Sequence, residues 1–324
     1  MVQRLQALWY GQSSWHLTLL LPVSWLYCAL VTLRREAYRL GLFRSVRLPA
    51  RVVVIGNLTS GGTGKTPLVI AITRCLQLAG YRVGIVTRGY GGRAGQWPQA
   101  VTADSNPHEV GDEAPLLAGH TGAPVFAGPD RVTAGRALLA AHPCDVLISD
   151  DGLQHYALQR DLEVLLIDSI LGLGNGHCLP AGPLREPRSR LTTVDAVAAI
   201  GAFPGVEWAF ELRAEAVHQV SAPAQTASLE SFRGDKVYAV AGIGNPQRFF
   251  ELLRQAGLDI EERIFADHHR FRREDLTFSR PHPVLMTEKD AVKCRDFAPR
   301  QCWYLPVTLV TPPAFDDWLL NRLA

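Results

Sequence analysis

The chain has 324 residues, 47% of them hydrophobic and 20% charged, a balance typical of folded proteins that excludes a disordered or low-complexity chain. Its net charge is +2, but residues 1–51 contain seven arginines and one acid, Glu36, so the rest of the chain is acidic overall. An acidic body argues against nucleic-acid binding, and the wide spacing of the six cysteines excludes a zinc knuckle or a C-x-x-C pair.

An N-terminal arm, residues 1–48, contains a mostly apolar stretch at 17–33, with aromatic residues around it and arginines after it. As one helix this stretch spans about 25 Å, slightly less than a hydrocarbon core of about 30 Å. We favour a helix that lies in the membrane interface; a full span and a buried structural helix are the alternatives. We expect the arm to be retained, because its charges mainly follow the apolar stretch and no cleavage site precedes the folded part.

Strands and helices alternate over residues 49–205. This alternation predicts right-handed crossovers and a mostly parallel sheet, so the expected fold class is α/β. The first helix is expected at 67–78, with Pro67 in its tolerated first turn and Gly80 after its end. The expected strands are 51–56, 82–87, 124–127, 145–149, 162–168 and 194–200.

The chain changes character near 205–220, where residues 208–220 form an extended piece with polar alternation. A second α/β alternation then begins at Lys236, which predicts a smaller domain over 206–324. Its expected strands are 236–242, 260–265, 284–287 and 302–307, and its expected helices are 246–256 and 315–323. The last helix is amphipathic and is able to dock on either domain.

A glycine-rich loop at 57–67, with the sequence N-L-T-S-G-G-T-G-K-T-P, joins the first strand to the first helix. Such a loop directs backbone N–H groups at phosphate oxygens, while a lysine adds charge and a hydroxyl ligates Mg²⁺. The strict pattern has glycine at position 59, where this chain has threonine. We still predict ATP or GTP binding. The residues of the phosphate site are Thr59, Ser60, Gly61, Gly62, Thr63, Gly64, Lys65 and Thr66.

Asp150 and Asp151 end an apolar strand. The carboxyl ends of parallel strands open on the same edge of a sheet as the phosphate loop, so either acid is able to hold Mg²⁺ directly or through water. A solvated turn is the alternative. Gln154 and His155 follow within reach of the same edge.

Asp112 and Glu113 lie near the start of a short helix. They either cap that helix or, in a kinase, supply the carboxylate that orients or accepts the proton of an attacking hydroxyl. Asp267-His268-His269 offers an imidazole in the second half of the chain.

Six motifs, taken together, resemble the tetraacyldisaccharide 4'-kinase family, the lipid A 4'-kinases of Gram-negative bacteria. The motifs are T-S-G-G-T-G-K-T-P at 59–67, T-R-G-Y-G-G at 87–92, G-D-E-A-P at 111–115, D-D-G-L-Q-H at 150–155, L-P-A-G-P-L-R-E-P at 179–187 and M-T-E-K-D-A-V-K at 286–293. Thr59 fits this family's own version of the loop. The arm at 1–48 is similar to the family's membrane-associated helix, so the resemblance covers nearly the whole chain.

The resemblance implies transfer of the ATP γ-phosphoryl group to the 4'-hydroxyl of tetraacyldisaccharide 1-phosphate, which makes lipid IVA in lipopolysaccharide biosynthesis. It implies ATP and Mg²⁺ as cofactors, the lipid disaccharide and the membrane surface as partners, and the cytoplasmic face of the bacterial inner membrane as the location. It also implies two α/β domains, the second closing the cleft at the nucleotide site. No nucleic acid or obligate protein partner is expected.

The resemblance also assigns residues. Asp112 is similar to the family's catalytic base, His268 to the partner of that base, and Lys65 to its phosphate-binding lysine. The residues similar to the metal group are Thr66, Asp150, Asp151, Glu113 and Glu186. The residues similar to substrate or phosphate contacts are Tyr90, Arg131, Gln154, His155 and Arg185.

Two other function classes are alternatives for parts of this sequence. A membrane-recruited P-loop ATPase switch or partitioning protein has lysine immediately before the glycine pair, where this chain has Ser60, and lacks the segment at 150–155. An oxidoreductase would use A-G-I-G-N-P at 241–246 as a dinucleotide-binding motif, but no third glycine follows at the spacing that this motif requires. A strand-to-helix turn accounts for that segment more simply.

Overall fold

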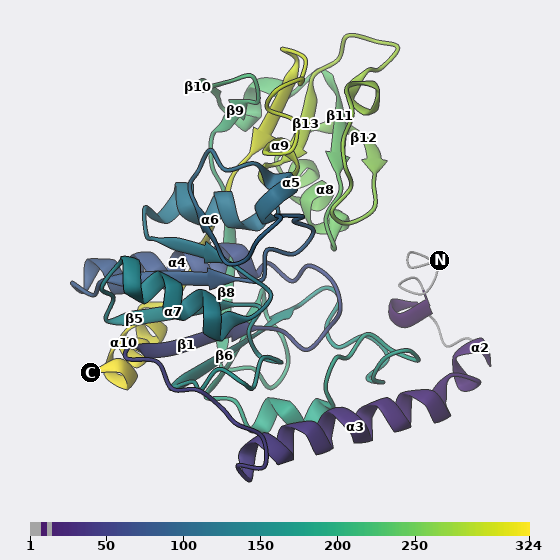
Figure 1. Ribbon diagram of the computed structural model, residues 1–324. Helices are drawn as coiled ribbons and strands as arrows, with labels where there is room; N and C mark the ends of the chain where they lie inside the picture. Colours follow the sequence, from purple (N-terminus) through teal and green to yellow (C-terminus); the bar gives the residue numbers. More distant parts are fainter. Residues whose placement is uncertain (1–7, 12–14) are drawn as a thin grey trace.

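The apolar runs of the sequence form two sheets in the computed structural model, which describes residues 8–11 and 15–324. Most neighbouring strands in both sheets are parallel, and helices cover the sheets (Figure 1). The predicted α/β class is confirmed. The strands of the larger sheet are β1 (Arg51–Gly56), β2 (Val83–Thr87), β3 (Gln99–Val101), β4 (Val125–Ala127), β5 (Val146–Asp150), β6 (Leu162–Asp168), β7 (Ala196–Ile200), β8 (Trp208–Ala214) and β15 (Val307–Val310).

β1 lies at the centre of this sheet, whose order is β15-β8-β7-β6-β1-β5-β2-β4-β3. It pairs in parallel with both β5 and β6, and its apolar side chains are buried on both faces because helices and loops cover the two sides. The carboxyl ends of β1 and β5 therefore meet at one edge, where the glycine-rich loop and Asp150 lie. All six strands predicted for this half are present, with ends within two residues of the prediction.

The smaller sheet has the order β10-β9-β14-β13-β11-β12 and its own core on each face. Its centre is a parallel group around β11, while β9 runs antiparallel to both of its neighbours. The bounds of its strands are β9 (Val217–Gln219), β10 (Ala222–Ala227), β11 (Lys236–Ala241), β12 (Asp259–Ile264), β13 (Val284–Thr287) and β14 (Cys302–Leu305).

The first long helix of the body, α4 (Lys65–Leu78), begins two residues before the predicted start, because Gly64 caps it in the left-handed conformation. It buries Leu68, Ile72 and Leu76 against the larger sheet. The α-helices that follow are α5 (Pro107–Val110), α6 (Glu113–Thr121), α7 (Arg131–Ala141), α8 (Pro246–Gln255), α9 (Glu288–Ala291) and α10 (Pro313–Leu323). α8 follows the turn at 241–246, as the strand-to-helix interpretation predicted.

The predicted boundary at residue 205 does not separate the two sheets, because β8 and β15, which both follow it, belong to the larger sheet. The strand predicted at 302–307 is two strands: Pro306, which has no N–H to donate, separates β14 in the smaller sheet from β15 in the larger one. The extended piece at 208–220 likewise divides into β8 and β9, which join different sheets. Phe210 and Phe315 are buried in the core of the larger sheet, so residues 208–214 and 307–323 complete that sheet instead of the smaller one.

The arm contains α2 (Trp15–Thr18) and α3 (Leu21–Arg39), and its residues 1–7 and 12–14 lie outside the described part. α3 lies on the far side of the larger sheet from the smaller sheet (Figure 1). Ser24 and Tyr27 hold it there, donating to the carbonyl oxygens of Cys178 (2.7 Å) and Arg185 (3.1 Å). Several large apolar side chains of α3 are exposed, namely Val23, Trp25, Leu26, Leu30 and Leu33. The alternative of a buried structural helix is therefore wrong. Among the described helices, none has the length and apolar character needed to cross a bilayer.

We predict that α10 contributes substantially to the stability of the larger sheet. Leu319 of α10 is fully buried in that core, so Leu319→Ala should lower the free energy of unfolding by about 2–5 kcal/mol. The matched control is Leu78→Ala, because Leu78 is 90% exposed and its replacement should change stability by less than about 0.5 kcal/mol. Urea denaturation measures both. Equal effects of the two substitutions would contradict the assignment of α10 to the core.

Candidate active site

The glycine-rich loop is fixed by its own side chains and by the segment at 178–187. Gly61 and Gly64 have φ values of +123° and +84°, which other residues rarely adopt. Thr59, in contrast, forms a β-bridge with Leu184, so position 59 is extended and does not need glycine. This bridge is a structural reason for the departure from the strict pattern. The loop ends at the N-terminus of α4, an arrangement suited to phosphate.

Lys65 is the first residue of α4. Its ammonium group donates to Asn57 Oδ1 at 3.0 Å and lies 3.4 Å from Asp151 Oδ1. Arg185 forms two further bonds to the Asp151 carboxylate, at 2.9 and 3.0 Å. Burial would raise the pKa of Asp151, but the charges of Lys65 and Arg185 outweigh it and hold that pKa far below its ordinary value. Asp151 is therefore an ionised partner of two cations.

Asp150 differs from its neighbour in having one unpaired oxygen. Its Oδ2 accepts a bond from Thr87 Oγ1 at 3.1 Å, whereas its Oδ1 has no hydrogen-bond partner among residues 8–11 and 15–324. Burial raises the pKa of Asp150 to about 7, and the negative charges of Glu113 and Asp151 add to this shift. A cation at this edge would therefore find a buried carboxylate oxygen that lacks a partner.

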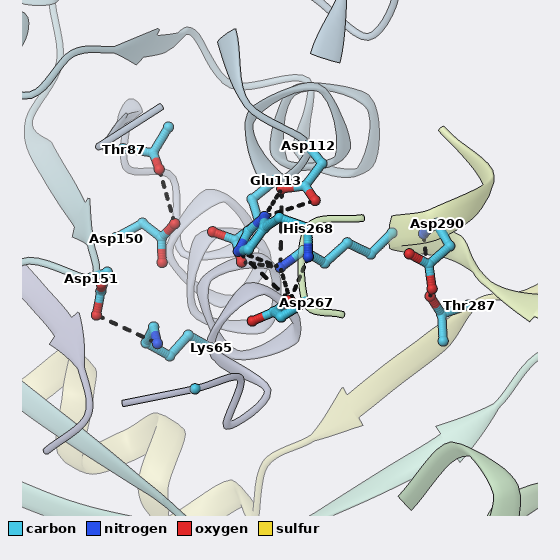
Figure 2. A network of polar contacts seen from close by, with 12 residues as sticks. Lys65, Thr87, Asp112, Glu113, Asp150, Asp151, Asp267, His268, Thr287 and Asp290 are labelled. Carbon is cyan, nitrogen blue, oxygen red and sulfur yellow. Dashed lines mark hydrogen bonds and ion pairs between the residues drawn. The ribbon is translucent and has the colours of Figure 1, made fainter. Parts of the chain in front are cut away.

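A second group of charges surrounds Asp112, which precedes α6 and is only 5% exposed. His268 Nδ1 lies 3.0 Å from both oxygens of its carboxylate. Figure 2 shows this contact, with Lys65 and Asp151 on one side of it and Asp290 on the other. Burial would raise the pKa of Asp112, but Lys289 and then His268 outweigh it and lower that pKa to about 2.

Asp112 belongs to the larger sheet, while the cations around it come from the smaller one. Lys289 Nζ is 4.0 Å from Asp112 and Lys293 Nζ is 3.7 Å from it. Lys289 also pairs with Glu113 at 2.9 Å, which raises the pKa of this buried lysine despite its burial. The carboxylate is thus held between the sheets by groups far away in sequence.

The two histidines of the 267–269 segment have different positions. His268 has a positive φ of 58° and its ring packs against Tyr90, with ring centroids 4.7 Å apart. His269 instead contacts Asp275 at 3.1 Å, within the smaller sheet's own loops. The structure therefore brings His268, and not His269, to Asp112.

Other predicted residues surround the edge where Asp150 and Asp151 lie. Arg131 donates to the carbonyl oxygens of both acids at 3.3 Å, and burial lowers the pKa of its guanidinium to about 10. Gln154 donates to the carbonyl of Asn57 at 3.4 Å. His155 lies 3.5 Å from Asp130, and its pKa is lowered mainly by burial. These residues form one wall of a cavity beside α3, which is also lined by Tyr27, Arg34 and Arg88.

Glu186 lines the cavity beside α3 together with Asp151, but its carboxylate already has partners of its own. It accepts a bond from Tyr156 Oη at 2.5 Å and pairs with Arg190 at 3.2 Å, and burial raises its pKa. Over residues 8–11 and 15–324, no three side chains of His, Cys, Asp or Glu are close enough to hold a metal ion by themselves. Any metal at this edge must therefore take further ligands from a hydroxyl, water or a bound phosphate.

A second cavity lies between the glycine-rich loop and the smaller sheet. Its wall on the side of the larger sheet comes from the loop and from Ile70 and Leu116, and its other wall comes from Phe249 and Leu252 of α8. His120 and Glu288, 2.8 Å apart, join the two sheets at this cavity. The cavity is mostly apolar and adjoins the phosphate loop.

Sequence reasoning missed Lys289, Lys293 and the close approach of Gly244 to the loop. One signal was present for the lysines. The chain has only four lysines, and two of them fall four positions apart in the motif at 286–293. For Gly244 there was no such signal, because its approach to Gly62 joins segments 182 residues apart.

Comparisons with known proteins identify relatives along the whole chain. A family model described as tetraacyldisaccharide-1-P 4'-kinase matches residues 16–324. The chain is 51% identical over 317 residues to the tetraacyldisaccharide 4'-kinase of Nitrosococcus oceani, covering 97% of this chain and 93% of that protein. It is 50% identical over 325 residues to that of Alkalilimnicola ehrlichii, covering 100% and 98%. A crystal structure of LpxK from Aquifex aeolicus in complex with ATP superposes with a TM-score of 0.77 at 28% identity, covering 95% of this chain and 99% of that one.

We predict that Gly244→Ala weakens nucleotide binding. A Cβ at Gly244 would stand 2.8 Å from the Cα of Gly62 and still closer to its backbone nitrogen, so the glycine-rich loop must shift. ATP affinity, measured by calorimetric titration, should fall about tenfold or more. The control is Gly95→Ala, because nothing lies within 4 Å of a Cβ at Gly95. Unchanged affinity of the Gly244 variant would show that the loop tolerates the shift.

Proposed function

The chain belongs to the tetraacyldisaccharide 4'-kinase family, and on this premise we propose how its residues carry out the reaction. Its activity is transfer of a phosphoryl group from ATP to the 4'-hydroxyl of tetraacyldisaccharide 1-phosphate, in lipid A biosynthesis. The observation that carries the proposal is the contact of Asp112 with His268 at 3.0 Å, near Lys65 and Asp150 (Figure 2). A base, a phosphate-binding lysine and a carboxylate with an unpaired oxygen are the groups that phosphoryl transfer to a hydroxyl requires.

Asp112 acts as the base. Its low pKa keeps the carboxylate ionised at neutral pH, so it accepts a hydrogen bond from the 4'-hydroxyl and orients that oxygen toward the γ-phosphorus. As the new P–O bond forms and the bond to the leaving ADP oxygen breaks, the hydroxyl proton passes to Asp112. His268 fixes the carboxylate during this step through the contact at Nδ1.

Lys65 and Asp150 hold the phosphates and their metal. Lys65 exchanges its bonds to Asn57 and Asp151 for the nucleotide's phosphate oxygens. The unpaired oxygen of Asp150 would hold a Mg²⁺ ion, and Thr66 and Glu113 would supply further oxygen ligands. Mg²⁺ supplies neutralisation of the negative charge that develops on the transferred group. Asp151, already paired with Arg185, orients Lys65, and Glu186 stabilises the neighbouring fold through Arg190.

The nucleoside and the lipid enter from different cavities. The apolar cavity between the loop and α8 takes the nucleoside of ATP, because it adjoins the phosphate loop. The cavity beside α3 takes the sugar of the lipid disaccharide, with Arg34, Arg88 and Arg131 around it and Tyr90 near His268. α3 lies in the membrane interface at the cytoplasmic face of the inner membrane, so the acyl chains stay in the bilayer while the sugar reaches Asp112.

The reaction is tested by measuring ATP-dependent phosphorylation of tetraacyldisaccharide 1-phosphate in mixed micelles with Mg²⁺. We expect Asp112→Asn to lower kcat by about 10²–10⁴ while ATP affinity changes less than about threefold. Lys65→Ala should lose both transfer and ATP affinity. Lys236→Ala is the matched lysine control, since Lys236 is exposed at the start of β11 in the smaller sheet. Loss of ATP affinity in Asp112→Asn would instead make Asp112 part of the nucleotide site, and retained transfer in both variants would refute the assigned site.

The interfacial position of α3 is tested by sedimentation with vesicles of anionic phospholipid. Leu26 and Leu30 are 61% and 57% exposed and lie one turn apart on α3. Replacing both with glutamate should lower the vesicle-bound fraction at least about tenfold, because each buried leucine contributes about 1.5–3 kcal/mol. Leu78→Glu, on α4, is the control and should bind like the wild type. Equal binding by all three proteins would contradict the proposed interface.

A further inference from the structure

Lys293 follows α9, and its side chain is only 5% exposed. Its ammonium group lies 2.6 Å from Asp290 Oδ1 and 3.7 Å from Asp112 Oδ2, so one buried cation bridges two buried carboxylates. The same ammonium group is 5.1 Å from the ring centroid of Phe271, which closes another side of its site. A cation enclosed in this way has little freedom to move.

Asp290 anchors this bridge in the smaller sheet. It is fully buried, and its Oδ2 accepts bonds from the Gly242 N–H at 2.8 Å and from Thr287 Oγ1 at 2.7 Å. Figure 2 shows Thr287 beside Asp290 at the end of this chain of contacts. The position of the Lys293 charge is therefore set, through Asp290, by the N–H of Gly242 directly after β11 and by the hydroxyl of Thr287 at the end of β13, and not by Asp112 alone.

Lys289 does not duplicate this role. It pairs with Glu113 at 2.9 Å and with Asp267 at 3.7 Å, and it stands 4.0 Å from Asp112. In the described part of the chain, Lys293 pairs with acids only at Asp290 and Asp112. Of the two lysines, Lys293 is thus the one whose contact with Asp112 does not compete with Glu113.

We propose that Lys293 is a positioning residue for phosphoryl transfer. It holds one oxygen of Asp112 from the side of the smaller sheet while His268 holds the carboxylate from another direction, so the remaining lone pairs face the acceptor hydroxyl. This inference rests on the proposed role of Asp112 as the base. Lys293 is the last residue of the motif at 286–293. It lines neither the proposed nucleotide cavity nor the proposed lipid cavity, and the proposal gives it a role in the reaction. The competing structural role is neutralisation of Asp290 alone.

The experiment compares four variants by kcat, by KM for ATP and by thermal denaturation. Lys293→Met should lower kcat about tenfold or more while KM for ATP changes less than about twofold, because the contact acts on the reacting geometry. Lys293→Arg keeps the charge and should recover at least about a third of the wild-type kcat. Lys236→Met is the matched control, with unchanged kcat, since its side chain is 44% exposed at the first residue of β11 and pairs only with Glu261 among the acids of the described residues.

The fourth variant separates positioning from folding. Lys293→Met leaves the buried Asp290 carboxylate without its cation, which lowers the stability of the folded protein. Asp290→Asn combined with Lys293→Met removes that unpaired charge and keeps an acceptor oxygen for Gly242 and Thr287. We expect this double variant to melt near the wild-type temperature and to keep the low kcat. Recovery of wild-type kcat in the double variant would overturn the proposal, because Lys293 would then serve Asp290 only.

Comparison of Lys293→Met with Asp112→Asn distinguishes failure of this inference from failure of the proposed function. If Asp112→Asn retains full transfer, the base itself is misassigned. If Asp112→Asn loses transfer while Lys293→Met keeps the wild-type kcat, the base stands and the positioning role of Lys293 is refuted.

Discussion

The organisation of the site follows from one constraint, that a buried carboxylate needs a partner for its charge. Asp112 is buried on the larger sheet and takes its partners, His268, Lys289 and Lys293, from the smaller sheet. The charges thus bring the two sheets together at the place where the phosphate loop ends. In the proposed mechanism the base is complete only when both sheets are in contact, which links the fold of the smaller sheet directly to the chemistry on the larger one.

The path of the chain supports this contact. It leaves the larger sheet after β8, builds the smaller sheet, and returns at Pro306 to form β15 and α10. Two crossings tie the sheets together, and the pairing of Arg248 on α8 with Asp168 at the end of β6, at 2.6 Å, adds a further tie beside the phosphate loop. On the side of α3, Tyr27 donates to the carbonyl oxygen of Arg185, whose guanidinium pairs with Asp151 beside Lys65. The proposed membrane helix therefore adjoins the proposed phosphate site through two side chains.

Much of this was predictable where the information is local. The glycine-rich loop, its strand and its helix lie within one short segment, and Asp150 ends a strand whose apolar run marks it, so sequence placed them correctly on one edge. Pro306 signals a break within residues 302–307, but the sheet that each half joins was not predictable from pattern, because both halves are β-rich and the packing of Leu309 and Phe315 in the core of the larger sheet decides it. The lysines around Asp112 were missed because their contacts span more than 170 residues. The difference between Asp150 and Asp151 was likewise not predictable, because Arg185 pairs with Asp151 and Thr87 bonds to only one oxygen of Asp150, and both partners come from other segments.

The central claim is that Asp112 and His268 act as one unit across the two sheets. A double-mutant cycle on kcat tests it most directly, with Asp112→Asn, His268→Gln and the two combined. The account predicts strong non-additivity, with the double variant no slower than Asp112→Asn alone, because His268 acts only through the carboxylate. Losses that multiply, so that the double variant is slower by the product of the two single effects, would contradict it.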